Sequence, residues 1–192
     1  LPPQRHAVAR QRRLVAAERV ALAAQLEDEP QQRLGRRRVL ARAVQRIAQL
    51  PDTRLGAVSA LYETPPWGDE DQSSFHNAVA SCATGLDPEA LLQGLQEIER
   101  DLGRVRDPER PWGPRAIDID ILLFGDITMD SATLTIPHPR LTERAFVLLP
   151  LVNTEPAIVI PGAGFARDLL ARLSSAGISQ IAAPGWEHAV RG

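Results

Sequence analysis

A strand-like segment in the second half of the chain places the strongest constraint on the fold. Residues 117–125 read IDIDILLFG, so isoleucine alternates with aspartate over the first five positions. Side chains alternate across a β-sheet, which puts the three isoleucines on one face and Asp118 and Asp120 on the other. One face of this strand therefore belongs to a core, and the other face is acidic. The segment predicts a sheet that packs helices against its apolar face.

Further strand and helix patterns surround this segment in a defined order. The segments 54–63 and 75–84 read as strands joined by a turn-rich loop, which predicts an antiparallel pair. Apolar residues spaced by three and four predict a helix over 36–50, and Asp87-Pro88-Glu89 begins another that ends at Gly103. A short strand at 133–137 and a helix at 140–151 follow. This order predicts an α+β, ferredoxin-like sandwich with helices on one face of an antiparallel sheet.

The N-terminal residues differ in composition from the rest of the chain. Residues 1–50 hold 11 arginines and 4 acidic residues, a net charge of +7, whereas residues 51–192 carry −9. Residues 6–29 are rich in Ala, Leu, Arg and Gln, which favour a helix. We therefore expect an atypical helical segment at 1–33, a main domain at 34–162 and a C-terminal extension at 163–192. A ferredoxin-like unit needs a strand before its first helix, and that strand is predicted to be missing or replaced.

Composition narrows the class of protein. The single cysteine, Cys82, cannot form an internal disulfide, and no apolar run reaches the roughly 18–20 residues of a membrane span. Every basic side chain apart from histidine is arginine, and the basic N-terminal segment lacks the interleaved aromatic residues of a single-strand platform. We expect a cytoplasmic monomer that binds small molecules, with no membrane partner and no nucleic acid.

The acidic face and the preceding loop suggest a phosphate site. Two carboxylates held about 7 Å apart on a strand repel each other unless a cation lies between them, and Mg²⁺ prefers such oxygen ligands. Guanidinium groups bind phosphate oxygens by paired hydrogen bonds, and the loop before the strand holds Arg104, Arg106, Arg110 and Arg115. Together these groups favour a nucleotide polyphosphate. The alternatives are solvent-exposed strand acids without a metal, or surface salt bridges between these acids and arginines.

A second group of residues suggests a flat heteroaromatic ligand. The loop Thr64-Pro65-Pro66-Trp67-Gly68 is stiffened by its prolines and offers an aromatic surface. Phe75 and Asn77 share a face of the next strand. The phenylalanine ring could stack on a flat ligand, and the amide could form hydrogen bonds with donors and acceptors at the edge of the ligand's ring. The alternative for these residues is ordinary core packing. His138 stands between two prolines and is equally compatible with a simple turn.

Several motifs together resemble hydroxymethyl-dihydropterin pyrophosphokinase, a family of folate biosynthesis. They are VSALYETPPWG at 58–68, FHNAV at 75–79, GRVR at 103–106, WGPRAIDIDIL at 112–122 and LTIPHPRLTERAF at 134–146. The resemblance runs from about residue 34 to 162. It implies a ferredoxin-like α+β fold and transfer of pyrophosphate from ATP to the hydroxymethyl oxygen of the pterin, with release of AMP.

The resemblance also implies a role for individual residues. Asp118 and Asp120 would bind two Mg²⁺ ions that bridge the ATP phosphates, and Arg104 and Arg115 would act in catalysis. The ATP-binding positions are Gln96, Glu99, Arg106, Arg110, His138 and Arg144. The pterin-binding positions are Thr64, Pro65, Pro66, Trp67, Phe75, Asn77, Trp112 and Phe146.

Two departures from the family pattern define an alternative hypothesis. Pro111 is inserted between the Arg and Trp of the loop motif, and of the family's N-terminal Gly-Ser-Asn-Leu-Gly-Asp only Leu34-Gly35 is present. The leading hypothesis is an active pyrophosphokinase. The alternative is an impaired remnant or ATP- and pterin-binding module that lacks the first strand. A generic two-metal nucleotidyltransferase is disfavoured because it leaves the Pro-Pro-Trp-Gly loop unexplained.

Overall fold

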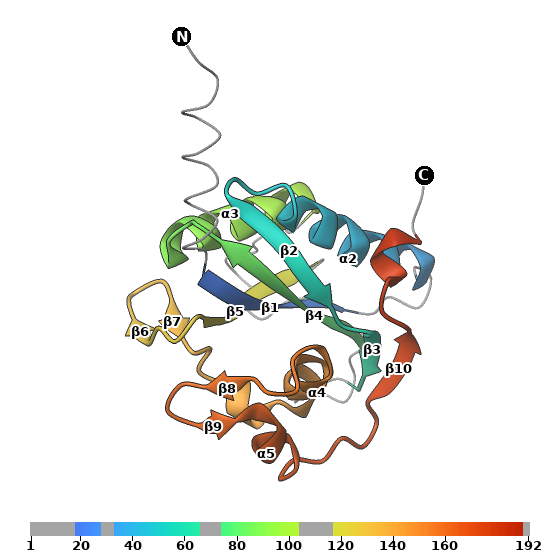
Figure 1. Ribbon diagram of the computed structural model, residues 1–192. Coiled ribbons are helices and arrows are strands. Elements are labelled where there is room, and N and C mark those ends of the chain that lie inside the picture. Colours follow the sequence, from blue (N-terminus) through green and yellow to red (C-terminus); the bar gives the residue numbers. More distant parts are fainter. Residues whose placement is uncertain (1–17, 28–32, 66–73, 104–116, 190–192) are drawn as a thin grey trace.

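The fold is an antiparallel sheet of six strands. The computed structural model describes residues 18–27, 33–65, 74–103 and 117–189. The strands lie in the order β10-β3-β4-β1-β5, and β2 pairs with the other half of β4 (Figure 1). Their bounds are β1 Glu18–Glu27, β2 Thr53–Val58, β3 Leu61–Thr64, β4 Phe75–Thr84, β5 Asp118–Phe124 and β10 Ser179–Ala182. The prediction of an α+β fold around an antiparallel sheet is confirmed.

The first strand is present, and the expectation that it is missing is wrong. β1 is paired on both sides: Ala24 lies opposite Ala78 of β4 and opposite Ile119 of β5. The apolar side chains Val20, Leu22, Ala24 and Leu26 occupy every second position and are all buried. Alanine and glutamine favour helix in isolation, but pairing with two neighbours and burial of one face outweigh that preference. The predicted helix over 6–29 therefore fails for residues 18–27, while residues 1–17 and 28–32 lie outside the described ranges.

One of the two strands predicted as an antiparallel pair is interrupted in the structure. β4 has the predicted bounds, but the segment expected as one strand at 54–63 is divided into β2 and β3. Ser59 occupies the break, where its Oγ accepts the Val79 backbone N–H at 2.9 Å and donates to the Ala60 carbonyl at 2.7 Å. A polar side chain thus replaces part of the strand ladder at this point.

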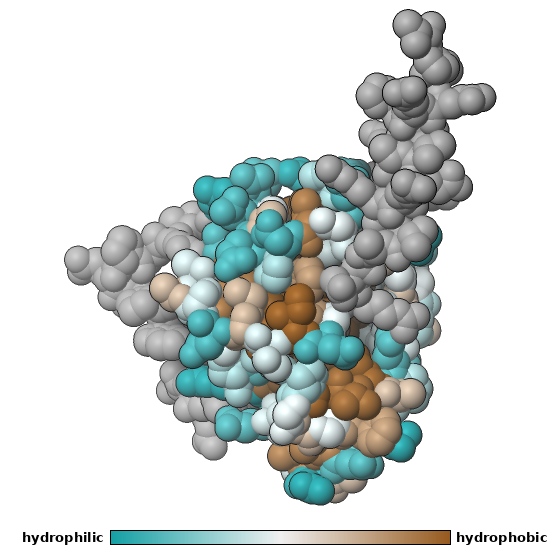
Figure 2. All heavy atoms as spheres, turned by 60° about the vertical axis from the view of Figure 1, so that its left-hand side comes forward, coloured by the Kyte–Doolittle hydropathy of each residue, from teal (hydrophilic) through white to brown (hydrophobic). Residues whose placement is uncertain are grey.

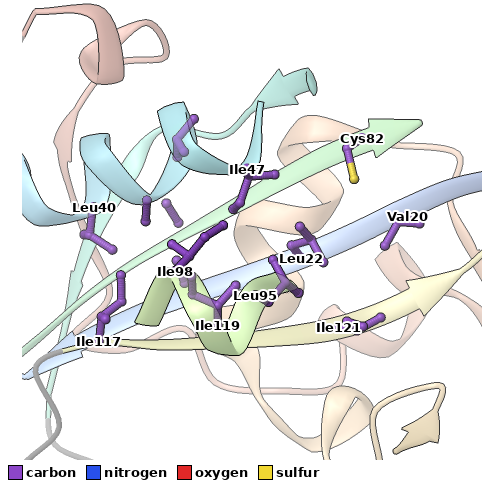
Figure 3. Packing of buried hydrophobic residues seen from close by; sticks show 14 of the residues in the cluster. Val20, Leu22, Leu40, Ile47, Cys82, Leu95, Ile98, Ile117, Ile119 and Ile121 are labelled. Carbon is purple, nitrogen blue, oxygen red and sulfur yellow. The ribbon is translucent and has the colours of Figure 1, made fainter. Parts of the chain in front are cut away.

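Two helices cover the apolar face of the sheet. These are α2, Arg33–Ile47, and α3, Pro88–Asp101. As predicted, Asp87 caps α3, since its Oδ1 accepts the Ala90 backbone N–H at 2.8 Å. The helices pack Leu40, Ile47, Leu95 and Ile98 against side chains from β1 and β5 (Figure 3). This layer contains the main core of the molecule.

The opposite face carries a second, smaller layer. It consists of α4, Ala145–Thr154, and α5, Ala166–Leu170, together with the short pair β8 (Val159–Ile160) with β9 (Gly164–Phe165). Another short pair, β6 (Met129–Asp130) with β7 (Thr135–Ile136), follows β5 and packs Ile136 into the main core. α4 packs Leu148 and Leu151 into a cluster with Ala21, Val79 and Leu122 of the sheet. Helices therefore lie on both faces, and only part of the acidic face is left open.

The C-terminal residues complete the sheet. β10 runs antiparallel to β3, with Ser179 opposite Glu63 and Gln180 opposite Tyr62 (Figure 1). Beyond it, in the turn η2 (Trp186–His188), the Trp186 indole is buried and its Nε1–H donates to the Ser59 carbonyl at 2.9 Å. Residues 163–189, the described part of the segment expected as an extension at 163–192, thus contribute an edge strand and a core side chain. Within the described ranges, none of the helices is long and apolar enough to cross a membrane.

Candidate active site

The acidic residues of β5 lie on the sheet face that α2 and α3 leave uncovered. Ile117, Ile119 and Ile121 are buried among the helices, whereas Asp118 and Asp120 are partly exposed. The predicted division of this strand into an apolar and an acidic face is therefore confirmed. Because β5 is the last strand in the order of this sheet, the two carboxylates stand at a margin of the sheet.

His138 lies beside Asp120. Its Nε2 lies 3.8 Å from Asp120 Oδ2, and its backbone N–H donates to the Leu122 carbonyl at 2.9 Å, which ties this turn to β5. The Arg140 backbone N–H donates to His138 Nδ1 at 3.2 Å. Since Nδ1 accepts that hydrogen bond, the proton of the neutral ring belongs on Nε2, the atom that faces the carboxylate.

Burial and charge both act on this group of side chains. Burial lowers the pKa of His138, and the nearby guanidinium of Arg144 lowers it further, while Asp120 opposes the shift. Burial also lowers the pKa of Arg144, which interacts electrostatically with Asp120 and Asp118. The structure thus gathers four of the predicted site residues: two acids, one imidazole and one guanidinium. A site of this charge pattern suits a metal ion and an anionic ligand together.

The donor set fits Mg²⁺ only in combination with a ligand. The described part of the chain holds no group of three or more His, Cys, Asp or Glu side chains that could bind a metal. Magnesium in nucleotide enzymes is commonly held by one or two carboxylates together with substrate phosphates and water. Asp118 and Asp120 have that character, since both carboxylates lie on one open face.

Glu99 lies between α3 and β5. It is only 2% exposed and its Oε1 accepts the Ile119 backbone N–H at 2.7 Å, while its predicted role in binding ATP stays a prediction. Ile119 lies between the two aspartates, so Glu99 joins α3 to the strand segment that carries them. Sequence patterns did not reveal this contact, because the partner is a backbone group. Gln96, one turn earlier on α3, is partly buried.

The residues predicted for the aromatic ligand meet at the same end of the sheet. Thr64 lies opposite Phe75, and the Asn77 amide Nδ2 donates to Thr64 Oγ1 at 2.8 Å. Gln25 of β1 lies opposite both Asn77 and Asp118. Directly opposite residues share a face, and each strand spacing is about 4.8 Å, so Asn77 and Asp118 face the same side about 10 Å apart. The sheet therefore brings the two predicted half-sites together.

A cavity of about 190 Å³ lies next to these residues. Thr64 and Pro65 form one wall, and Arg144 and Phe146 form another, with the Arg144 guanidinium carbon 5.7 Å from the centre of the Phe146 ring. The remaining lining residues are Glu143, Ala145, Leu173, Ser174, Ala176 and Ile178. Phe75 and Asn77 are buried and do not line this cavity. Sequence patterns gave no signal for the contribution of residues 173–178.

A larger cavity, of about 570 Å³, lies at the other end of β1 and β5. Its lining includes Val20, Ser81, Asp126, Glu155 and Val159 and none of the predicted site residues. Figure 2 turns this side of the molecule forward and shows hydrophobic side chains at the surface among hydrophilic ones. Volume alone therefore does not locate the site, and the grouping of charged side chains around Asp120 is the better guide.

Some predicted site residues lie outside the described ranges. These are Pro66, Trp67, Arg104, Arg106, Arg110, Trp112 and Arg115, and the inserted Pro111 lies there as well. Their predicted roles stay predictions. The described site thus consists of Thr64, Pro65, Phe75, Asn77, Asp118, Asp120, His138, Arg144 and Phe146, with Gln96 and Glu99 on the neighbouring helix.

Known proteins resemble the chain in sequence and in fold. A protein from Methylorubrum extorquens named 2-amino-4-hydroxy-6-hydroxymethyldihydropteridine pyrophosphokinase is 46% identical over 143 residues, 74% of this chain and 89% of that protein. One of the same name from Pseudomonas aeruginosa is 45% identical over 139 residues, 72% of this chain and 85% of its own length.

Among solved structures, Plasmodium falciparum HPPK-DHPS matches with a TM-score of 0.63 at 17% identity and shows the same fold. The match covers 81% of this chain but only 43% of that longer protein. A model of the family described as 7,8-dihydro-6-hydroxymethylpterin-pyrophosphokinase (HPPK) matches residues 31–156. The chain belongs to this pyrophosphokinase family.

Proposed function

We propose that this chain transfers pyrophosphate from ATP to the hydroxymethyl group of 6-hydroxymethyl-7,8-dihydropterin and releases AMP, as a step of folate biosynthesis. The observation that supports this best is the shared sheet face, on which Asn77 and Asp118 lie about 10 Å apart across one intervening strand. A ring bound near Asn77 and a phosphate chain bound near Asp118 would meet between these strands. Family membership supports the same reaction.

Asp118 and Asp120 are the residues that would hold magnesium. Two Mg²⁺ ions bound there would neutralise charge on the ATP phosphates and so make the transferring group more reactive. Both carboxylates lie on the open face, and His138 and Arg144 complete the polar surroundings. We assign these two aspartates to catalysis on that basis.

Arg144 and His138 are assigned to binding ATP. Electrostatic attraction to Asp120 and contact with the Phe146 ring hold the Arg144 guanidinium in place. Burial lowers the pKa of His138, which favours the neutral ring, and the bond that Nδ1 accepts from the Arg140 N–H leaves the proton on Nε2. His138 can therefore donate one hydrogen bond to a phosphate oxygen without adding charge. Gln96 and the loop arginines Arg106 and Arg110 complete the proposed ATP site.

Thr64, Pro65, Asn77 and the aromatic rings are assigned to the pterin. Phe75 and Phe146 would stack on the bicyclic ring, and Asn77 would read its edge once the amide exchanges its Thr64 partner for the ligand. Pro66, Trp67 and Trp112 belong to the same proposed site, and Arg104 and Arg115 to the catalytic group. The chemistry needs no nucleophilic side chain: the pterin hydroxyl oxygen attacks the β-phosphorus and its proton is released to solvent. The bond between the β-phosphorus and the oxygen that bridges it to the α-phosphate breaks, and AMP leaves with that oxygen.

The alternative of an impaired remnant has lost its basis. That hypothesis required a missing first strand, and β1 is present between β4 and β5. Action as a cytoplasmic monomer is a further part of the proposal.

The test is an assay of AMP release with purified protein, ATP and Mg²⁺. We expect AMP to form only when 6-hydroxymethyl-7,8-dihydropterin is present, in a one-to-one ratio with the pyrophosphorylated pterin. Release of AMP without the pterin would favour a different ATP-cleaving enzyme. Binding of both ligands without AMP would restore the binding-module hypothesis.

A further inference from the structure

The C-terminal part of the chain is attached to the strand from which the proposed pterin loop begins. β3 ends at Thr64, and β10 pairs with β3 through Ser179 opposite Glu63 and Gln180 opposite Tyr62. The residues just before β10 therefore lie beside the residues just after β3. All of these C-terminal residues follow position 156, where the family match ends.

Gly177 makes the close approach between these two segments. Its φ is +78°, a conformation that side chains with a Cβ rarely adopt. A Cβ placed on Gly177 would lie 3.1 Å from Pro65 Cγ and 3.2 Å from Pro65 Cδ. These distances are shorter than most Cβ contacts in proteins, so a methyl group on residue 177 would fit only if the Pro65 ring moved by a few tenths of an ångström.

The same contact borders the 190 Å³ cavity. Ala176 and Ile178 flank Gly177 and line the cavity, as do Thr64 and Pro65. Thr64 also accepts the hydrogen bond from the Asn77 amide. A displacement of Pro65 would therefore move Thr64, and with it the Asn77 amide that is proposed to bond the edge of the pterin ring. At its other end the C-terminal segment is fixed by Trp186, which is buried and bonded to the Ser59 carbonyl.

We propose that Gly177 is a positioning residue for the dihydropterin site: its bare backbone sets the position of Pro65, and through it Thr64 and the Asn77 amide. The inference rests on the proposed function. It means that residues outside the family match determine how the first pterin-binding residues are held. No chemical step involves Gly177 itself, so its effect is confined to binding of the pterin.

The test compares Gly177→Ala with Gly162→Ala in the full chain. Gly162 has nearly the same φ, +76°, but a Cβ there would have no neighbour within 4 Å. Both variants therefore carry the same backbone strain, and only Gly177→Ala pushes on Pro65. Steady-state AMP release is measured while the dihydropterin and ATP are varied in turn. We expect Gly177→Ala to raise the KM for the dihydropterin by about threefold to tenfold, with kcat and the KM for ATP unchanged. Gly162→Ala should leave all three values as in the parent.

Two results would overturn the proposed role of Gly177. Equal pterin KM values in the two variants would overturn it, and so would an equal rise in the KM values for pterin and ATP in Gly177→Ala. If Gly177→Ala does not fold, Gly177→Asn and Gly162→Asn replace the pair, because asparagine tolerates a positive φ better and still carries the Cβ. A parent protein that shows no pterin-dependent AMP release would instead overturn the proposed function, which separates the two failures.

Discussion

The contact between Glu99 and β5 gives a prediction that separates folding from chemistry. Glu99 is 2% exposed, Ile119 is 4% exposed, and the Glu99 Oε1 accepts the Ile119 N–H at 2.7 Å. Replacing Glu99 with leucine keeps most of the side-chain volume and removes the acceptor. The buried N–H then has no partner, which costs about 1–3 kcal/mol. We expect Glu99→Leu to lower the free energy of unfolding by that amount in urea titrations.

The matched control is Glu97→Leu on the same helix. The Glu97 side chain is exposed, and its Oε1 lies 3.8 Å from Arg100 NH2, so this substitution should change the stability by less than about 0.5–1 kcal/mol. AMP release should also fall in Glu99→Leu at temperatures where the protein stays folded, because Ile119 lies between Asp118 and Asp120. Equal stabilities for the two variants would refute the reasoning. So would full activity in a Glu99→Leu protein that has lost the expected stability.

Three further predictions concern the site, the core and the single thiol. Asp120→Asn should reduce AMP release at saturating Mg²⁺ to below about a tenth of the parent, whereas Asp126→Asn, at the far end of β5, should retain activity; similar losses in both would argue against a metal at Asp120. Trp186→Ala should cost about 3–5 kcal/mol in urea unfolding, because the indole is buried and its N–H is bonded to the Ser59 carbonyl, and a loss below about 1 kcal/mol would contradict its place in the core. Burial raises the pKa of Cys82 from 9.0 to about 11, so the unfolded thiol ionises first and stability should fall by about 3 kcal/mol between pH 9 and 11. That fall should be absent in Cys82→Ala, and parallel pH profiles of the two proteins would contradict the shift.

The features that the sequence predicted well are those set by local pattern. The alternation of Ile and Asp in 117–121 decides which face of β5 is buried, since a shift of the pairing by one residue would bury both carboxylates. Asp87 caps α3 through a bond that spans only three residues. Asp118, Asp120, His138 and Arg144 come together because β5 and the turns that follow it are close in the chain.

The features that were missed depend on partners far away in the chain. β1 was interpreted as helix because Ala-rich sequence favours helix, and only β4 and β5 on either side make it a strand. The bond from the Ile119 N–H to Glu99 was missed because its donor is a backbone group, which no side-chain motif reveals. Residues 173–182 were treated as an extension because their role comes from contact with Pro65 and β3, more than a hundred positions earlier.

The position of β1 in the sheet has a consequence for how the protein forms as it is synthesised. β1 is made before all the other strands of the sheet, yet its partners β4 and β5 begin only at residues 75 and 118. Likewise, β3 cannot pair with β10 until residues from 179 onward have been made. The hairpin of β2 and β3 with β4 can form early, but it stays an incomplete sheet with unpaired edges until the later strands emerge. Such long-range pairing slows folding. Nascent chains therefore carry unpaired strand edges until residues 118–124 and 179–182 have been made, and in that interval the edges are free to pair wrongly with other chains.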